Sequence, residues 1–213
     1  MQFRPLSELP TPKITRRNLP HWETPGATYF VTFRLEDSIP AGLLCELESL
    51  RDGWLKAHGI THDSELFRLP ENQRREFHRT ITAQEERWLD QGHGSCLLRH
   101  KEPRERSEGA LRFFDGKRYA LDAFVIMPNH VHVLILPYHE WELSKITPAW
   151  KKHAAREINL LLGRQGGLWQ KESYDHIVRD LEQFEAYRRY IANNPAKLRL
   201  GEYTLGKGSG IEP

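Results

Sequence analysis

The stretch that decides the fold is RYALDAFVIMPNHVHVLIL, residues 118–136. It holds two apolar runs separated only by Pro128 and Asn129, and two apolar segments joined by so short a turn predict a β-hairpin. Both runs are apolar on both faces, so we expect them to be central strands of a sheet. His130 and His132 flank Val131 in the second run. Because strand side chains alternate, the two imidazoles share a face and Val131 points the other way.

Two imidazoles on one face, two residues apart, can hold one divalent cation. The His-x-His spacing alone is a weak signal, because two hydrogen-bonded histidines at the end of a strand would look the same. A buried histidine costs free energy unless it has a partner, and the neighbouring Leu134 and Leu136 offer nothing polar. A metal ion or a third polar group must therefore come from elsewhere in the fold.

Around the hairpin, local patterns predict an order of strand, helices, strand, strand, helix, strand, helix. We expect a strand over 28–36, helices over 40–59, 70–92 and 103–114, a helix over 147–162, an edge strand over 173–178 and a last helix over 180–194. Thr147 is the predicted N-cap of the fourth helix, with Pro148 in its first turn, and Asp180 with Gln183 forms a predicted capping box for the last. Without the last helix, this order is the ferredoxin-like split βαβ pattern of an α+β fold with a central antiparallel sheet.

Length and composition bound the class of protein. The 213 residues fit one domain with elaborations, and a net charge of only +2 does not by itself indicate a nucleic-acid binder. We find no apolar run long enough to span a bilayer and no secretory signal, and Cys45 and Cys96 form no metal or disulfide motif. We therefore expect a cytoplasmic protein without a membrane partner. Residues 1–20 look like a basic arm, and 201–213 like a short tail.

The last helix carries a second candidate set. Tyr190 and Asn194 are one helical turn apart, so both project from the same side and can reach a shared point. Pro195 follows directly and disfavours helical backbone at Asn194, which leaves the position of that side chain open. Without a metal pair elsewhere, Tyr190 would be an ordinary surface tyrosine of an amphipathic helix.

Basic side chains could line a track for phosphates, although each could equally belong to a solvated face. The candidates are Lys151, Lys152, Arg156, Arg179, Arg188, Arg189, Arg16 and Arg17. Trp169 could stack on an unpaired base, whereas Trp150 lies on an apolar stripe and is better explained as core.

Three segments together resemble a known family. They are LDAFVIMPNHVHVLILP, LWQKESYDHIVRDLEQFEAYRRYIANNPAKLRL and LPHWETPGATYFVTFRLED. The chain resembles the REP-associated tyrosine transposases, within the HUH superfamily of single-strand transposases and nucleases. The resemblance covers most of residues 15–200, except a helical stretch near 60–95. MPNHVH and YIxxNP in this order are specific together, and neither is specific alone.

The resemblance implies an IS200-like HUH catalytic domain over 21–200, with a helical insertion at about 40–95 and a C-terminal helix that bears the tyrosine. It implies that His130, His132 and Asn194 bind Mg²⁺ or Mn²⁺, and that Tyr190 is the nucleophile. Tyr190 would attack a phosphodiester of single-stranded DNA, form a 5′-phosphotyrosine and free a 3′-hydroxyl. The implied activity is that of a DNA endonuclease and strand transferase on hairpins formed by palindromic repeats, as a monomer or a homodimer.

Several alternatives stay open at the level of sequence. Tyr187 and Tyr174 are competing nucleophiles, and Asp175 or His176 could complete a metal site instead. A domesticated relative could bind hairpin DNA without turnover. A third possibility is a metal-dependent phosphodiesterase with a water nucleophile.

Overall fold

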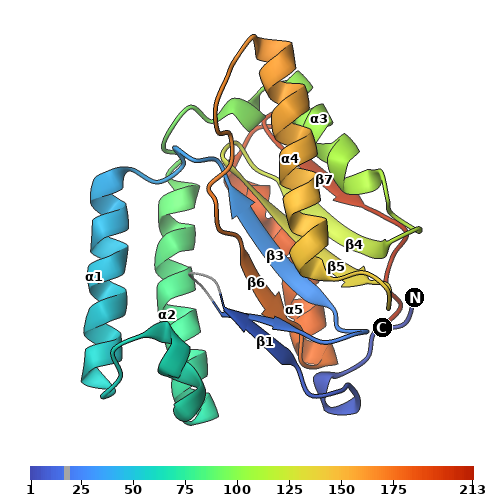
Figure 1. Ribbon diagram of the computed structural model, residues 1–213. Coiled ribbons are helices and arrows are strands. Elements are labelled where there is room, and N and C mark those ends of the chain that lie inside the picture. The colour runs from blue at the N-terminus through green and yellow to red at the C-terminus, as the bar shows by residue number, and fades with distance from the viewer. Residues whose placement is uncertain (17–19) are drawn as a thin grey trace.

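The computed structural model of the chain describes residues 1–16 and 20–213. Its centre is a five-stranded antiparallel sheet (Figure 1). The strand order is β6 (Tyr174–Ile177), β3 (Tyr29–Arg34), β5 (His130–Pro137), β4 (Tyr119–Ile126) and β7 (Thr204–Lys207). Along the chain, β3, helices, β4, β5, a helix and β6 follow the β-α-β-β-α-β order. The predicted α+β, ferredoxin-like fold is therefore confirmed.

Five α-helices surround this sheet in the described chain. They are α1 (Ala41–Ala57), α2 (Glu71–Asp90), α3 (Lys101–Arg112), α4 (Leu143–Leu162) and α5 (Leu181–Asn193). Short 3-10 helices lie at Leu6–Glu8, Asp63–Arg68, Leu97–Arg99 and Asn194–Lys197, and β1 (Lys13–Arg16) pairs with β2 (Pro20–Glu23). In the described residues, no helix combines the length and apolarity needed to cross a membrane.

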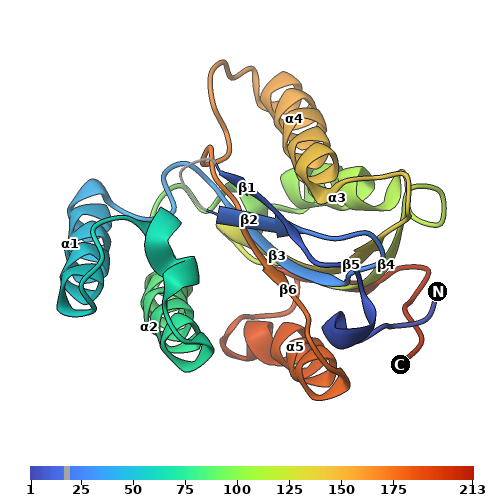
Figure 2. The ribbon, with the colours of Figure 1, turned by 60° about the horizontal axis from the view of Figure 1, so that its bottom comes forward.

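The two faces of the sheet carry separate cores, as strand alternation requires. On one face, Val131 and Val133 of β5 pack with Trp150 of α4, under α3 and α4 (Figure 2). On the other, Leu134 of β5 packs with Phe184 of α5. His130 and His132 alternate with the valines, so they lie on the face that α5 covers.

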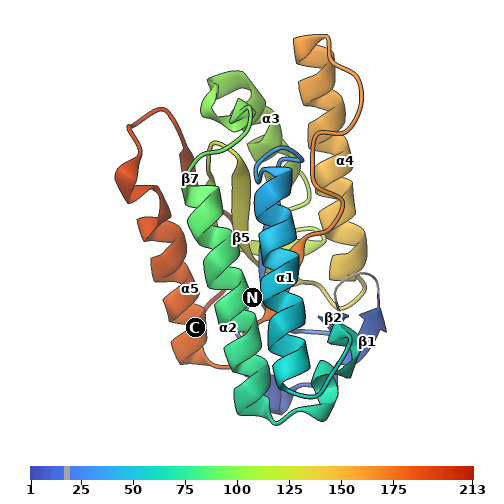
Figure 3. The same cartoon turned by 90° about the vertical axis from the view of Figure 1, so that its left-hand side faces the viewer.

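The predicted helical insertion is present as α1 and α2, which pack on each other through a small core of their own that includes Leu55 and Phe77. It is fastened to the sheet where Arg34 of β3 donates to Glu85 of α2, with 3.0 Å between Nε and Oε1. Figure 3 shows α2 lying beside α5. The insertion therefore borders the helix that carries Tyr190.

The predicted start of α4 was wrong, because the helix begins at Leu143 and Pro148 lies inside it. Pro148 has no N–H to donate to the carbonyl of Ser144. The extra turn is held instead by tertiary contacts. Leu143 is buried, and Glu23 accepts the Ser144 N–H at 2.7 Å. The sequence analysis also missed β7, in the expected tail, and the β1–β2 hairpin, whose first strand lies in the expected arm.

Candidate active site

The two histidines lie at the start of β5, and neighbouring side chains fix the orientation of their rings. Both are buried, and their ring centroids are 4.6 Å apart. His130 donates its Nδ1–H to Asn129 Oδ1 at 2.8 Å, and Asn129 is itself held by a hydrogen bond to the carbonyl of Leu89 at the end of α2. His132 Nδ1 is 2.8 Å from Thr32 Oγ1 on β3. Each ring thus uses Nδ1 for anchoring, which leaves Nε2 for the site.

The histidines are neutral. Burial lowers the pKa of His130 to about 3. Burial and the neighbouring His130 lower the pKa of His132 well below its ordinary value. A neutral imidazole keeps a lone pair on the nitrogen that does not donate, so both side chains are in the form that ligates a metal ion or accepts a hydrogen bond.

Tyr190 comes from α5 and points at His132. The predicted start of α5 is confirmed, because Asp180 Oδ1 accepts the Gln183 N–H at 2.8 Å. Phe184 and Ile191 bury the inner face of the helix. The Tyr190 hydroxyl lies 3.4 Å from His132 Nε2, with the two ring centroids 5.1 Å apart. The tyrosine oxygen and the two imidazoles therefore meet at one place.

Asn194 completes this group. Its backbone is helical, with φ −54° and ψ −44°, although Pro195 follows. The proline lies in the first turn of the 3-10 helix, where the lack of an N–H costs nothing. The side chain of Asn194 reaches back one turn to the Tyr190 hydroxyl and interacts with it. The spacing predicted from the sequence is thus the spacing found.

The donor set fits a divalent cation. Asn194 Oδ1 is buried and has no hydrogen-bond partner in the part of the chain that the structure describes. An orphaned amide oxygen and two imidazoles, brought together around the Tyr190 hydroxyl, are a mixed donor set that suits Mn²⁺ well and Mg²⁺ acceptably. Among the described residues, no cluster of three His, Cys, Asp or Glu side chains could hold a metal ion. The third protein donor to such an ion would accordingly be the amide of Asn194.

The alternatives at Tyr174, Tyr187 and His176 occupy other surroundings. Tyr187 stacks on Phe30, with ring centroids 4.2 Å apart. The Tyr174 hydroxyl lies next to Thr82 of α2, and burial raises the pKa of Tyr174 to about 12. His176 Nε2 lies 3.2 Å from Gln183 Nε2. Of the three tyrosines, Tyr190 is the one whose hydroxyl the described structure joins to a histidine of β5.

Lys151 and Arg188, two of the predicted DNA contacts, have partners within the protein. Lys151 Nζ donates to the carbonyl of Gln170 at 2.6 Å, and also to the carbonyl of Lys171 and the hydroxyl of Ser173. The Arg188 guanidinium donates two parallel hydrogen bonds, of 2.8 and 2.6 Å, to the Asp122 carboxylate. Both cations hold structure together, and their contact with DNA stays a prediction.

The remaining basic candidates do not form one surface. Lys152 and Arg156 are exposed on α4, on the opposite side of the sheet from the histidines. Arg189 is exposed on α5, and Arg179, just before that helix, is half-buried. The side chain of Arg16 and the whole of Arg17 fall outside the described residues. Trp150 is core, as expected, and Trp169 is buried against Phe33, with ring centroids 4.9 Å apart.

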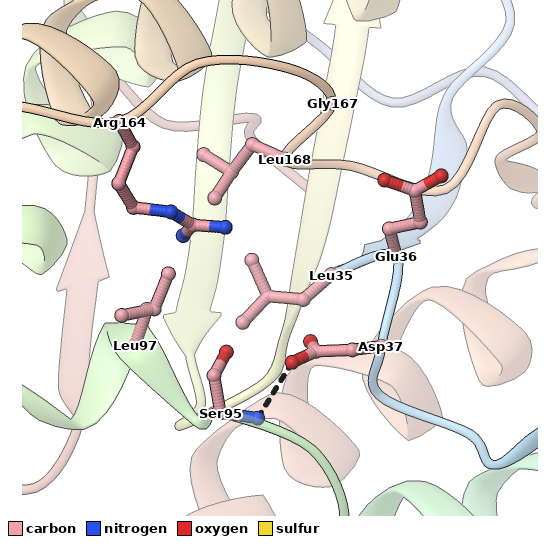
Figure 4. Close-up of a pocket in the computed structure, with 8 residues that line it drawn as sticks. All are labelled: Leu35, Glu36, Asp37, Ser95, Leu97, Arg164, Gly167 and Leu168. Carbon is pink, nitrogen blue, oxygen red and sulfur yellow. Dashed lines mark hydrogen bonds between the residues drawn. The ribbon is translucent and has the colours of Figure 1, made fainter.

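A separate hollow lies past the end of β3, between the loop after α4 and the segment before α3 (Figure 4). Leu35, Leu97 and Leu168 form its apolar part, and Arg164 extends over it. These leucines belong to the core under α3 and α4. The hollow is therefore on the other face of the sheet from Tyr190 and is not part of the candidate active site.

Sequence reasoning missed Glu86, which α2 contributes to the site. The Glu86 carboxyl lies next to the Tyr190 hydroxyl and interacts with it. Burial and the negative charge of Glu86 raise the pKa of Tyr190 above its ordinary value. Thr82, Glu86 and Asp90 recur at helical spacing along α2, and that polar stripe was the one available signal.

The chain was compared with known families, curated proteins and solved structures. Residues 101–194 match the model of the family described as "Transposase IS200 like". A solved structure described as "Structure of the REP associates tyrosine transposase bound to a REP hairpin" is 17% identical, with a TM-score of 0.41, over 86% of this chain and 72% of that one. No curated protein matches the chain.

The matched residues include β5 with its two histidines and Tyr190. The match confirms the resemblance stated from the sequence over this part of the chain. This family is of transposase or endonuclease type and is generally dependent on divalent metal ions.

Proposed function

We propose that this protein nicks single-stranded DNA and transfers the cut strand through a covalent 5′-phosphotyrosine at Tyr190. Its substrates would be hairpins formed by palindromic repeats, and its cofactor Mg²⁺ or Mn²⁺. The observation that carries the proposal is the convergence of four groups: His130, His132, Tyr190 and Asn194. A tyrosine buried merely for packing would not need two neutral imidazoles and an unpartnered amide oxygen around its hydroxyl.

The residues divide the work by position. His130 Nε2, His132 Nε2 and Asn194 Oδ1 would hold the metal ion, which polarises a phosphate and orients it when bound. Thr32 and Asn129 fix the imidazole rings from behind. These two residues hold the imidazole rings in one orientation.

Tyr190 supplies the nucleophilic oxygen. A covalent intermediate splits a difficult strand transfer into two easier steps and keeps the broken bond available for rejoining. The phenol must lose its proton on attack, and burial in the free protein opposes this by raising the pKa of Tyr190. The site therefore needs a group that takes the proton from that hydroxyl.

Two other functions remain candidates. A protein that binds hairpin DNA without turnover would have no need of the Tyr190–His132 contact, and that contact favours the enzyme. A phosphodiesterase with a water nucleophile would leave Tyr190 as a bystander. Cytoplasmic location and a monomeric or homodimeric state stay predictions.

The test is a denaturing gel after the protein is mixed with Mn²⁺ and labelled single-stranded DNA that forms repeat hairpins. We expect a covalent protein–DNA band with the wild type and none with Tyr190→Phe, while Tyr187→Phe keeps the band. Hairpin binding without a band would favour the inactive binding protein. Cleavage without a band would favour the water-nucleophile enzyme.

A further inference from the structure

Helix α2 reaches the candidate active site although it lies outside the matched residues 101–194. It lies beside α5 (Figure 3). Thr82 lies next to the Tyr174 hydroxyl, and Glu86 lies next to the Tyr190 hydroxyl. At its end, the carbonyl of Leu89 accepts from the Asn129 side chain, which in turn anchors His130. The insertion thus contacts both the nucleophile and the anchor of one histidine.

We propose that Glu86 is a catalytic residue, the group that accepts the hydroxyl proton of Tyr190 when the tyrosine attacks DNA. The inference rests on the proposed function and adds to it a residue from the helical insertion. It stands on the position of the Glu86 carboxyl next to the reacting hydroxyl. In the described structure Asn194 also lies next to this hydroxyl, but an amide N–H can only donate to it. His132 Nε2 is the other acceptor nearby, and as a metal ligand it would have no lone pair left.

The step balances as follows. The Tyr190 oxygen bonds to phosphorus, and its proton passes to a carboxylate oxygen of Glu86. The bond between phosphorus and the 3′ oxygen breaks, its electron pair stays on that oxygen, and the oxygen takes a proton from solvent. When a 3′-hydroxyl later attacks the phosphotyrosine, its oxygen bonds to phosphorus and its proton passes to solvent. The bond between phosphorus and the tyrosine oxygen breaks, and Glu86 returns its proton to that departing oxygen.

The electrostatics of Glu86 suit this role. Burial raises its pKa to about 7, with further upward contributions from Asp90 and Glu85. A proton acceptor works best when its pKa lies near the working pH. The titratable groups around it are Tyr190 and Tyr187 of α5, Tyr174 of β6, and Asp90 and Glu85 of α2. The pKa values of the three tyrosines are all raised, so the tyrosines stay protonated near neutral pH. The control variants for the pH dependence therefore replace Asp90 and Glu85.

The experiment compares single-turnover rates of covalent adduct formation with Mn²⁺ and a repeat hairpin. Glu86→Gln keeps the shape of the side chain but accepts no proton, and Glu76→Gln on the exposed side of the same helix is the matched control. We expect Glu86→Gln to lose at least about 100-fold in rate, Glu86→Asp to retain part of it, and Glu76→Gln to match the wild type. Mn²⁺ affinity and hairpin affinity should be unchanged in all three.

A pH profile separates proton transfer from packing. The wild-type rate should rise with pH through about 7, and this rise should vanish in Glu86→Gln but persist in Asp90→Asn and Glu85→Gln. Wild-type rate in Glu86→Gln, or a loss of rate matched by a loss of Mn²⁺ affinity, would overturn the inference and leave the proposed function standing. If the wild type itself forms no adduct, the proposed function fails and the inference fails with it.

Discussion

Thr32→Val tests whether the histidines are held from behind as the structure indicates. Thr32 Oγ1 lies 2.8 Å from Nδ1 of His132, a residue with 0% exposure. Valine has nearly the same shape and favours strands, so the change removes the hydrogen bond and little else. A buried polar group left without its partner costs about 1–3 kcal/mol. For a domain of this size, each kcal/mol shifts Tm by about 2–4 °C, so we expect a fall of about 2–12 °C.

Thr28→Val is the matched control, one residue before β3. Thr28 is 0% exposed, and its Oγ1 has no hydrogen-bond partner in the described part of the chain. Burying a hydroxyl without a partner is unfavourable, so this substitution should leave Tm unchanged or raise it. The two variants make the same chemical change and should move Tm in opposite directions, or at least by clearly different amounts.

The assay is thermal unfolding of both variants with a chelator present, followed by Mn²⁺ titration of the folded proteins. Loss of the residue that orients a ligating imidazole typically costs about 10–100-fold in metal affinity. We expect that loss for Thr32→Val and no change for Thr28→Val. Equal Tm values and equal Mn²⁺ affinities for the two variants would refute the reasoning.

Two further predictions concern stability. Asp122→Ala should lower the free energy of unfolding by about 3 kcal/mol, because it removes the bidentate partner of Arg188, whose side chain is only 29% exposed. Arg189→Ala, at an exposed position, should leave the free energy of unfolding unchanged. Equal urea midpoints for the two variants would contradict this prediction. In metal-free protein, stability should fall as pH drops below about 6.5, because the unfolded chain then protonates His130 and His132 while burial keeps the folded ones neutral. The slope should reach about 1.4 kcal/mol per pH unit for each histidine; urea midpoints between pH 7 and 5 measure it, and a flat profile would count against neutral buried imidazoles.

Local patterns predicted those parts of the protein that short-range geometry determines. The hairpin turn at Pro128 and Asn129 follows from two apolar runs with almost nothing between them. The shared face of the two histidines follows from alternation alone. The capping of α5 by Asp180 follows from the spacing to Gln183. None of these features needs information from distant residues.

What local patterns missed depended on distant partners. Lys151 and Arg188 have acceptors within the protein, which the sequence did not reveal because it shows a charge but not its acceptor. Four residues of β7 are too few to give a pattern, and the strand exists because β4 offers it an open edge. Glu86 was hidden in a helix that is polar almost throughout. Its surroundings depend on where α2 packs, and the polar stripe along α2 does not show which helix it will face.

Asn194 shows how a local rule is overridden to build the site. The residue before a proline avoids helical backbone by preference, yet here it keeps that conformation. The buried ring of Pro195 and the buried side chain of Ile191 hold this end of α5 against the sheet. Packing thus offsets the free energy of this unfavourable backbone conformation. The conformation places the Asn194 amide one turn from the Tyr190 hydroxyl. We therefore expect the position of Asn194 to depend on how firmly α5 is docked, so that loosening the helix at Asp122 should weaken Mn²⁺ binding without touching any metal ligand.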